Sequence, residues 1–241
     1  MNISIIRPIA ATVAGTFTNP ERMASPDPKE VAYTVGAGAK TIDLDLGSVQ
    51  DVGAIYLGGV SGATSFAVTG GAASYTTTNF GNIVVAPSRS GTAPRQYLLT
   101  LDASLRYIRL SANLADGFEV GIAFAGERFT PEWNQEYGAG RYLIDTSAVA
   151  RNRAGGFGID EGAIIPGYEF TLGDLSDEEA EALFELLRKV GESRPMLVCE
   201  DATVSSDLDA RTHYGLFQRI EKYERRSINV TRWSLKLERW I

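Results

Sequence analysis

Hydrophobic and polar residues alternate through much of the first 128 positions. At 41–47, Ile42, Leu44 and Leu46 alternate with polar neighbours, and the same two-residue period runs through 118–124. A period of two places these side chains on one face of a β-strand. Strands are predicted at 41–47, 52–57, 65–68, 82–87, 96–101, 106–110 and 118–124. Glycine and proline separate them and no helical pattern intervenes, which predicts an all-β sandwich.

The remaining positions mix strands with one amphipathic helix. Ser176 and Glu179 form a capping box, and Gly191 supplies the stop, so a helix is predicted at about 177–190. Its apolar positions recur at helical spacing: Ala182, Leu183, Leu186, Leu187 and Val190. Strands are predicted at 141–145, 163–172 (started or interrupted by Pro166), 195–199, 214–223 and 232–240. This order indicates an α+β domain.

Charge divides the chain in the same place. Residues 1–128 contain 9 Lys/Arg and 10 Asp/Glu, whereas residues 129–241 contain 14 and 20. Pro131 follows the last strand of the first part, where a residue without an N–H commonly ends a ladder. We therefore predict a mainly β protein with two domains, a jelly-roll β-sandwich at 1–128 and an α+β domain with one packed helix at 129–241.

Composition offers little reactive chemistry. The chain has one cysteine and one histidine in 241 residues, and its net charge is −7. A single cysteine excludes an internal disulfide framework, and the negative net charge argues against a nucleic-acid-binding surface. No apolar run is long enough for a transmembrane helix, and the first residues lack the pattern of a secretory signal. We expect no catalysis, no cofactor and no metal site.

The individual reactive residues have ordinary interpretations. His213 is expected at a strand start or in a loop, and Cys199 as a buried thiol that ends an apolar strand. The acidic group Glu200, Asp201, Asp207 and Asp209 does not match a calcium loop and is expected to be solvated, with a fortuitous divalent-ion site as the alternative. The glycines at 155–158 predict a flexible loop, since no strand and helix flank them as in a dinucleotide fingerprint.

Two segments resemble a known fold family. The stretch KTIDLDLG at 40–47 is similar to the I-x-I-D-L-G strand of galactose-binding-like (discoidin-type) jelly rolls, and LRYIRL at 105–110 is similar to their x-R-Y-I-R-L strand. Both are strand signatures and neither is a ligand signature. Members of that family often bind glycans through loops at one end of the sandwich. The resemblance implies such a jelly roll over about 100 residues here.

The order of the whole chain resembles a distal-tail or tail-tip protein of a long-tailed bacteriophage. The features behind this are the leading jelly roll, the capped helix after LGDLS at 172–176 and the terminal WSLKLE strand at 233–238. The resemblance implies a structural protein of the virion tail, made in the cytoplasm of the bacterial host. It also implies a homo-oligomeric ring formed by the C-terminal domain, with other phage tail proteins as partners. DNA is expected to pass an acidic lumen without specific binding.

Aromatic residues are the candidate contacts. Those that could anchor subunit interfaces, or else belong to the core, are Trp133, Tyr214, Tyr223, Trp233 and Trp240. The alternative function is a carbohydrate-binding module that contacts host-surface glycan. Its candidate contact loop holds Tyr75, Asn79 and Phe80, because sugars stack on aromatic rings. A hydrolase would need an acid/base pair, and none can be picked from the sequence.

Overall fold

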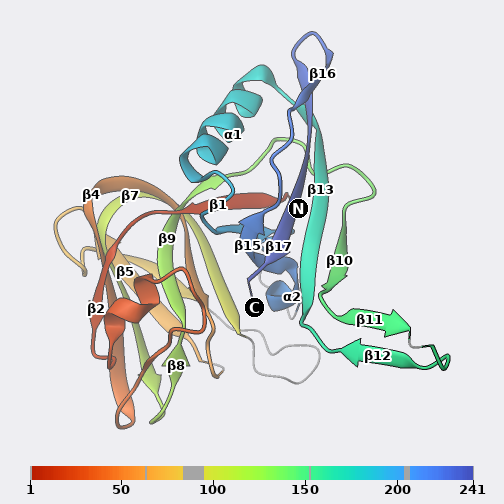
Figure 1. The fold of residues 1–241 in the computed structure, drawn as a ribbon. Coiled ribbons are helices and arrows are strands. Elements are labelled where there is room, and N and C mark those ends of the chain that lie inside the picture. The colour runs from red at the N-terminus through yellow and green to blue at the C-terminus, as the bar shows by residue number, and fades with distance from the viewer. Residues whose placement is uncertain (1, 63, 84–94, 152, 204–206, 241) are drawn as a thin grey trace.

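The computed structural model describes residues 2–62, 64–83, 95–151, 153–203 and 207–240 (Figure 1). The protein is mainly β, and one large antiparallel sheet runs through both predicted parts. The elements up to residue 129 are β1 (Ser4–Pro8), β2 (Thr12–Gly15), the 3-10 helix η1 (Pro20–Ala24), β3 (Ala32–Tyr33), β4 (Gly38–Gly58), β5 (Phe66–Gly71), β6 (Thr78–Ile83), β7 (Gln96–Leu114), β8 (Glu119–Val120) and β9 (Ile122–Phe129). Within these described residues, no helix is both long and apolar enough to cross a bilayer.

Two very long strands build the sandwich. The N-terminal half of β4 pairs with β2 and with the C-terminal half of β7, whereas its C-terminal half pairs with β9 and the N-terminal half of β7. Irregularities between Asp45 and Gln50, where Gly47 has a φ of 77°, let the strand turn from one layer into the other. Both halves contribute side chains to one apolar core.

These long strands differ from the sequence prediction. The strands predicted at 41–47 and 52–57 are both parts of β4, and those at 96–101 and 106–110 are both parts of β7. The pattern predicted separate strands, with Gly47 as a turn or a bulge; the register shifts show bulges, which interrupt the pattern without ending the strand. The strand predicted at 82–87 lies mostly outside the described residues, and β6 ends at Ile83.

The second part is a sheet covered by the predicted helix. Its elements are β10 (Gly140–Asp145), β11 (Ala148–Arg151), β12 (Phe157–Asp160), β13 (Ile164–Leu175), α1 (Asp177–Val190), β14 (Met196–Cys199), α2 (Leu208–Arg211), β15 (Thr212–Phe217), β16 (Glu224–Ser227) and β17 (Val230–Arg239). The capping box of α1 is confirmed: Ser176 Oγ accepts from the Glu179 N–H, and the Glu179 carboxylate accepts from the Ser176 N–H. Leu183 and Leu187 then pack with Phe170 and Trp233 of the sheet.

Three predictions for this part were wrong in detail. β13 runs through Pro166, because the pairing of β13 with β17 begins only at Gly167 and proline therefore costs no hydrogen bond on that side. The strand predicted at 214–223 ends at Phe217. The segment 157–160 is a strand and not a flexible loop, since it pairs with β11.

Strand β1 joins the two parts. It pairs with β9 on one side and with β14 on the other, so the sheet crosses the predicted boundary at 128/129 without a break. Ile3 and Ile5 lie in the core of the second part, although they come from the start of the chain. Ile6 belongs to a third apolar cluster between the parts, with Tyr56, Phe124 and Tyr214. The division into two domains stays a prediction.

Candidate functional site

An arm projects from the edge of the second part. Strands β10 and β13 form a long hairpin, and beyond it the chain continues as the two-stranded ribbon β11–β12, which we call the arm (Figure 1). The ribbon forms a two-stranded sheet of its own. Its base is fixed, because Thr146 Oγ1 donates to the carbonyl of Ala163 at 2.9 Å and the Gly162 N–H donates to Ser147 Oγ at 3.0 Å. The arm therefore leaves the body of the protein at a defined place.

The arm exposes large apolar side chains. Val149 faces Ile159 and Arg151 faces Phe157 across the ribbon, so these four share one face. Val149, Phe157 and Ile159 are 62%, 58% and 65% exposed, and the Arg151 guanidinium lies 5.1 Å from the Phe157 ring centre. The other face has Ala148, Ala150 and Gly158, and Asp160 lies opposite Ala148. An isolated two-stranded ribbon is marginally stable in water, and an exposed apolar one needs a covering surface.

The strand at the base of the arm is also uncovered. β10 is the terminal strand in the order of the large sheet, so one of its edges has no neighbouring strand in the chain as described. Leu143 on β10 and Ile164 on β13 are 71% and 57% exposed. An edge strand with exposed apolar residues is a template for pairing with another chain. The uncovered surface thus continues from the arm into the sheet edge.

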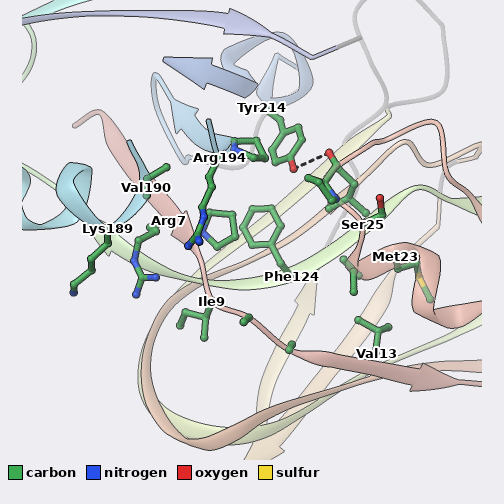
Figure 2. Close-up of a pocket in the computed structure, with 18 of the residues that line it drawn as sticks. Arg7, Ile9, Val13, Met23, Ser25, Phe124, Lys189, Val190, Arg194 and Tyr214 are labelled. Carbon is green, nitrogen blue, oxygen red and sulfur yellow. Dashed lines mark hydrogen bonds between the residues drawn. The ribbon is translucent and has the colours of Figure 1, made fainter. Parts of the chain in front are cut away.

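A pocket of about 450 Å³ lies between the sandwich and the second part (Figure 2). The connection after β1, the end of η1, strand β9 and the loop after α1 form its walls. Phe124 and Tyr214 lie at its centre, with their ring centroids 6.2 Å apart. The Tyr214 hydroxyl donates to the carbonyl of Pro26 at 3.0 Å, and burial raises the pKa of this phenol, so it stays a donor at neutral pH. The interior is therefore apolar and well defined.

One side of the pocket is cationic. Arg7, Lys189 and Arg194 gather there, away from Val13 and Met23 (Figure 2). Arg7 donates twice to a Glu127 carboxylate oxygen, at 2.9 and 2.7 Å, and Lys189 Nζ lies 3.6 Å from the same oxygen. Arg194 is exposed and makes no ion pair with any described residue. In a chain of net charge −7, this rim would attract an acidic group.

The five aromatic residues that could anchor interfaces differ in how far they are exposed. Trp233 and Tyr214 are 2% and 5% exposed, so within the chain they are core residues. Trp133 and Tyr223 are 64% and 38% exposed, and Trp240 is half-buried against the cluster between the two parts. Tyr223 also packs against the Trp233 ring at 5.3 Å. Trp133 is thus the most accessible of the five.

The three residues expected to contact glycan do not form one loop surface. Asn79 and Phe80 belong to strand β6, where Asn79 accepts from the Gly81 N–H and Phe80 packs on the sandwich core. Tyr75 instead lies on the outer face of the sandwich, with its ring 5.0 Å from that of Tyr107 and 5.0 Å from the Arg109 guanidinium.

Around Tyr75 the two resemblance motifs meet. Asp43 lies opposite Arg109 in the β4–β7 pairing, and the two are joined by hydrogen bonds of 2.6 and 2.7 Å. Arg106 donates to Asp45 at 2.9 Å, and the Arg106 guanidinium lies 4.7 Å from the Tyr107 ring. The alternating aspartates thus lie on the solvent face, as the two-residue period predicted. The result is a polar surface with two partly exposed phenol rings.

The other candidate groups are buried or paired within the chain, except that the buried Nδ1 of His213 has no hydrogen-bond partner among the described residues. His213 lies at the start of β15, 1% exposed, with its Nε2–H donating to Glu200 at 2.7 Å; Arg141 also donates to Glu200 at 2.7 Å. Burial lowers the pKa of His213. Burial alone would raise the pKa of Glu200, but the two hydrogen bonds lower it overall. Cys199 is buried, as expected.

The predicted acidic loop is likewise neutralised. Asp201 and Asp207 pair with Arg211, and Asp209 accepts from the Arg95 N–H. Over the described ranges, no group of three or more His, Cys, Asp or Glu side chains converges as metal ligands would. Asp201 is therefore buried beside Arg211, and the prediction that it is solvated was wrong.

Sequence reasoning missed both the arm and the pocket. In the arm, the alternation of Phe157 and Ile159 with Gly158 and Asp160 is a strand signal, but the glycines before it favoured a loop. The pocket brings together residues from five separate segments, between Arg7 and Tyr214, and no local pattern can indicate that.

Comparison with known proteins gives remote similarities of fold. No protein-family model matches the sequence, and no curated protein matches it. A chitosan-binding module from a chitosanase/glucanase of Paenibacillus sp. IK-5 is 14% identical, with a TM-score of 0.40 over 51% of this chain and 99% of that one. The lectin domain of lectinolysin, solved with Lewis B antigen, is 14% identical, with a TM-score of 0.39 over 49% of this chain and 95% of that one.

A fucolectin from striped bass (Morone saxatilis) is 8% identical, with a TM-score of 0.39 over 71% of each chain. All three are carbohydrate-binding proteins by their descriptions. Likeness this remote does not transfer a ligand to the present chain, so its function must be argued from its own surfaces.

Proposed function

We propose that this protein is a non-catalytic structural subunit that assembles with copies of itself through the arm. The observation that carries the proposal is the exposure of Val149, Phe157 and Ile159 on a ribbon that, among the described residues, pairs with no strand of the large sheet. Burying such side chains yields roughly 1.5–3 kcal/mol each. A covering surface on another subunit would supply that stabilisation.

The setting we propose is the tail tip of a long-tailed bacteriophage. It rests on the resemblance of the chain's organisation to distal-tail proteins, with a jelly roll followed by a β-domain that has one packed helix. In this setting the protein is made in the bacterial cytoplasm and ends in the virion tail as a ring, in contact with other tail proteins. The acidic excess of residues 129–241 would let DNA pass the lumen without binding.

Self-assembly is tested by measuring mass as a function of concentration. We expect the purified protein to form oligomers in native mass spectrometry and light scattering, and Ile159→Asp to be monomeric. Ile228→Asp is the matched control, because Ile228 is 89% exposed at the far hairpin of β16 and should tolerate the same change. A wild-type protein that stays monomeric at every concentration contradicts the proposal. Antibody labelling of intact particles in electron microscopy tests the location, and tails without label would overturn it.

A second candidate function, binding of host-surface glycan, is favoured by the surface around Tyr75. Sugars bind where an aromatic ring offers a stacking face and charged groups offer paired hydrogen bonds. Tyr75 and Tyr107 lie beside the Asp43–Arg109 and Asp45–Arg106 pairs, and all are partly exposed. This role would be compatible with assembly, since the surface lies on the sandwich and the arm on the second part.

A glycan array separates this function from assembly. We expect binding that is lost in Tyr75→Ala and kept in Phe80→Leu, because Phe80 packs on the core and is not on the Tyr75 surface. Absence of binding to every glycan, by the assembled protein as well as the monomer, would remove this candidate and leave assembly unaffected.

A further inference from the structure

We propose that the arm of one copy inserts into the pocket of the next copy. In this contact Phe157 and Ile159 pack on the apolar interior beside Phe124 and Tyr214, and Glu161, which follows β12 at the base of the arm, pairs with Arg194 at the rim. The inference deepens the proposed self-assembly, because it names the surface that receives the arm.

The chemistry of the arm matches that of the pocket. Directly after Ile159 the chain has Asp160 and Glu161, both exposed, and neither pairs with a basic group of the described residues. Phe157 and Ile159 lie on one face of β12 and Asp160 lies on the other face, opposite Ala148, whereas Glu161 follows the strand at the base of the arm. The pocket presents the complement, which is an apolar interior with Arg7, Lys189 and Arg194 along one side.

The size of the pocket also suits this occupant. A volume of about 450 Å³ lies in the range of pockets that enclose small ligands, roughly 300–1,000 Å³. Two side chains carried by a thin ribbon fill such a space without large rearrangement. Pro8, Pro26 and Pro195 line the walls, and their restricted backbones keep the opening in place before the arm arrives.

The positions of arm and pocket favour a ring. In Figure 1 the arm extends to one side of β13, whereas β1 and α1, which border the pocket, lie on the other side. Two different, complementary surfaces on opposite sides of a subunit give a head-to-tail contact, and repeated rotation then closes a ring or continues as a filament. A symmetric dimer would instead use the same surface twice.

Disulfide trapping tests the contact directly. One protein preparation has Ile159→Cys and a second, of different mass through a tag, has Ser193→Cys, whose position lies at the rim beside Arg194. We expect a mixed covalent dimer on mild oxidation only when the two are combined. The native Cys199 interferes little, because it is buried and its pKa is raised to about 11. Ile228→Cys replaces Ile159→Cys in the control and should give no mixed dimer.

A charge exchange gives an independent measurement. We expect Arg194→Glu to weaken self-association at least about tenfold, and Glu161→Arg in the same chain to restore it, as for a complementary pair at an interface. No mixed dimer, or one equally abundant with Ile228→Cys, would overturn the inference. If Ile159→Asp abolishes assembly while trapping and charge exchange fail, the arm binds elsewhere and the proposed function stands. If the wild-type protein does not self-associate, both are wrong.

Discussion

Replacing Trp233 by alanine should destabilise the isolated chain, because the indole lies in the core of the second part. Trp233 is 2% exposed on β17, its Nε1–H donates to the carbonyl of Glu221 at 2.8 Å, and its ring lies 5.3 Å from that of Tyr223. Truncation of a buried aromatic residue to alanine costs about 3–5 kcal/mol. Trp133→Ala is the matched control: Trp133 is 64% exposed, so the free energy of unfolding should change by no more than about 0.5 kcal/mol.

Urea unfolding followed by far-ultraviolet circular dichroism gives this free energy without relying on tryptophan fluorescence. For a chain of this length each kilocalorie should lower the melting temperature by about 2–4 °C. Trp233→Phe keeps an aromatic ring but loses the N–H. If Trp233→Ala does not fold, this milder variant should still show a measurable, smaller loss of unfolding free energy. The reasoning is refuted if Trp233→Ala unfolds at the wild-type urea concentration but no longer assembles, because the indole would then be an interface anchor.

Three further changes have defined outcomes. Burial lowers the pKa of His213 in the folded protein, so its contribution to stability is complete above about pH 6.5 and falls as the pH drops below that value. His213→Phe should therefore flatten the decrease in unfolding free energy below about pH 6.5, and an unchanged slope contradicts this. Gly215→Ala should cost about 1–3 kcal/mol in thermal unfolding, because its Cβ would lie 1.9 Å from the Glu238 carbonyl oxygen, whereas Gly140→Ala, with no atom within 4 Å, should be neutral. Cys199 should react with a thiol reagent only as fast as the protein unfolds, since it is buried with a pKa of about 11; rapid labelling of the native protein at pH 8 would disprove its burial.

Local patterns predicted what depends on neighbours in sequence. The helix predicted at about 177–190 is confirmed, because the capping box of Ser176 and Glu179 and the stop at Gly191 are local signals; on its apolar face, however, Ala180 and not Ala182 is buried. Likewise, the alternation around Asp43 placed the aspartates on the outside, where each meets an arginine of β7. Periodicity carries this information because it reports directly which face of an element is buried.

What the sequence did not reveal depends on distant segments. A bulge interrupts the two-residue period in the same way as a turn does, so β4 was predicted as two strands. The aromatic residues look alike in sequence, yet Trp233 lies in the core and Trp133 on the surface, because the helix α1 covers one and not the other. The pocket rim, from Arg7 to Arg194, exists only once the sheet has brought those segments together.

The place of β1 in the sheet has a consequence for how the chain reaches its native state. Ile5 pairs with Val198, so β1 waits for a partner that is made almost two hundred residues later. Closing so long a loop is entropically costly and slows folding. Until β14 arrives, β1 extends the edge of an already formed sandwich as an unpaired, isoleucine-rich strand. Residues 129–241 made alone would leave the edge of β14 that faces β1 without a partner strand. We therefore expect neither half to remain soluble without the other.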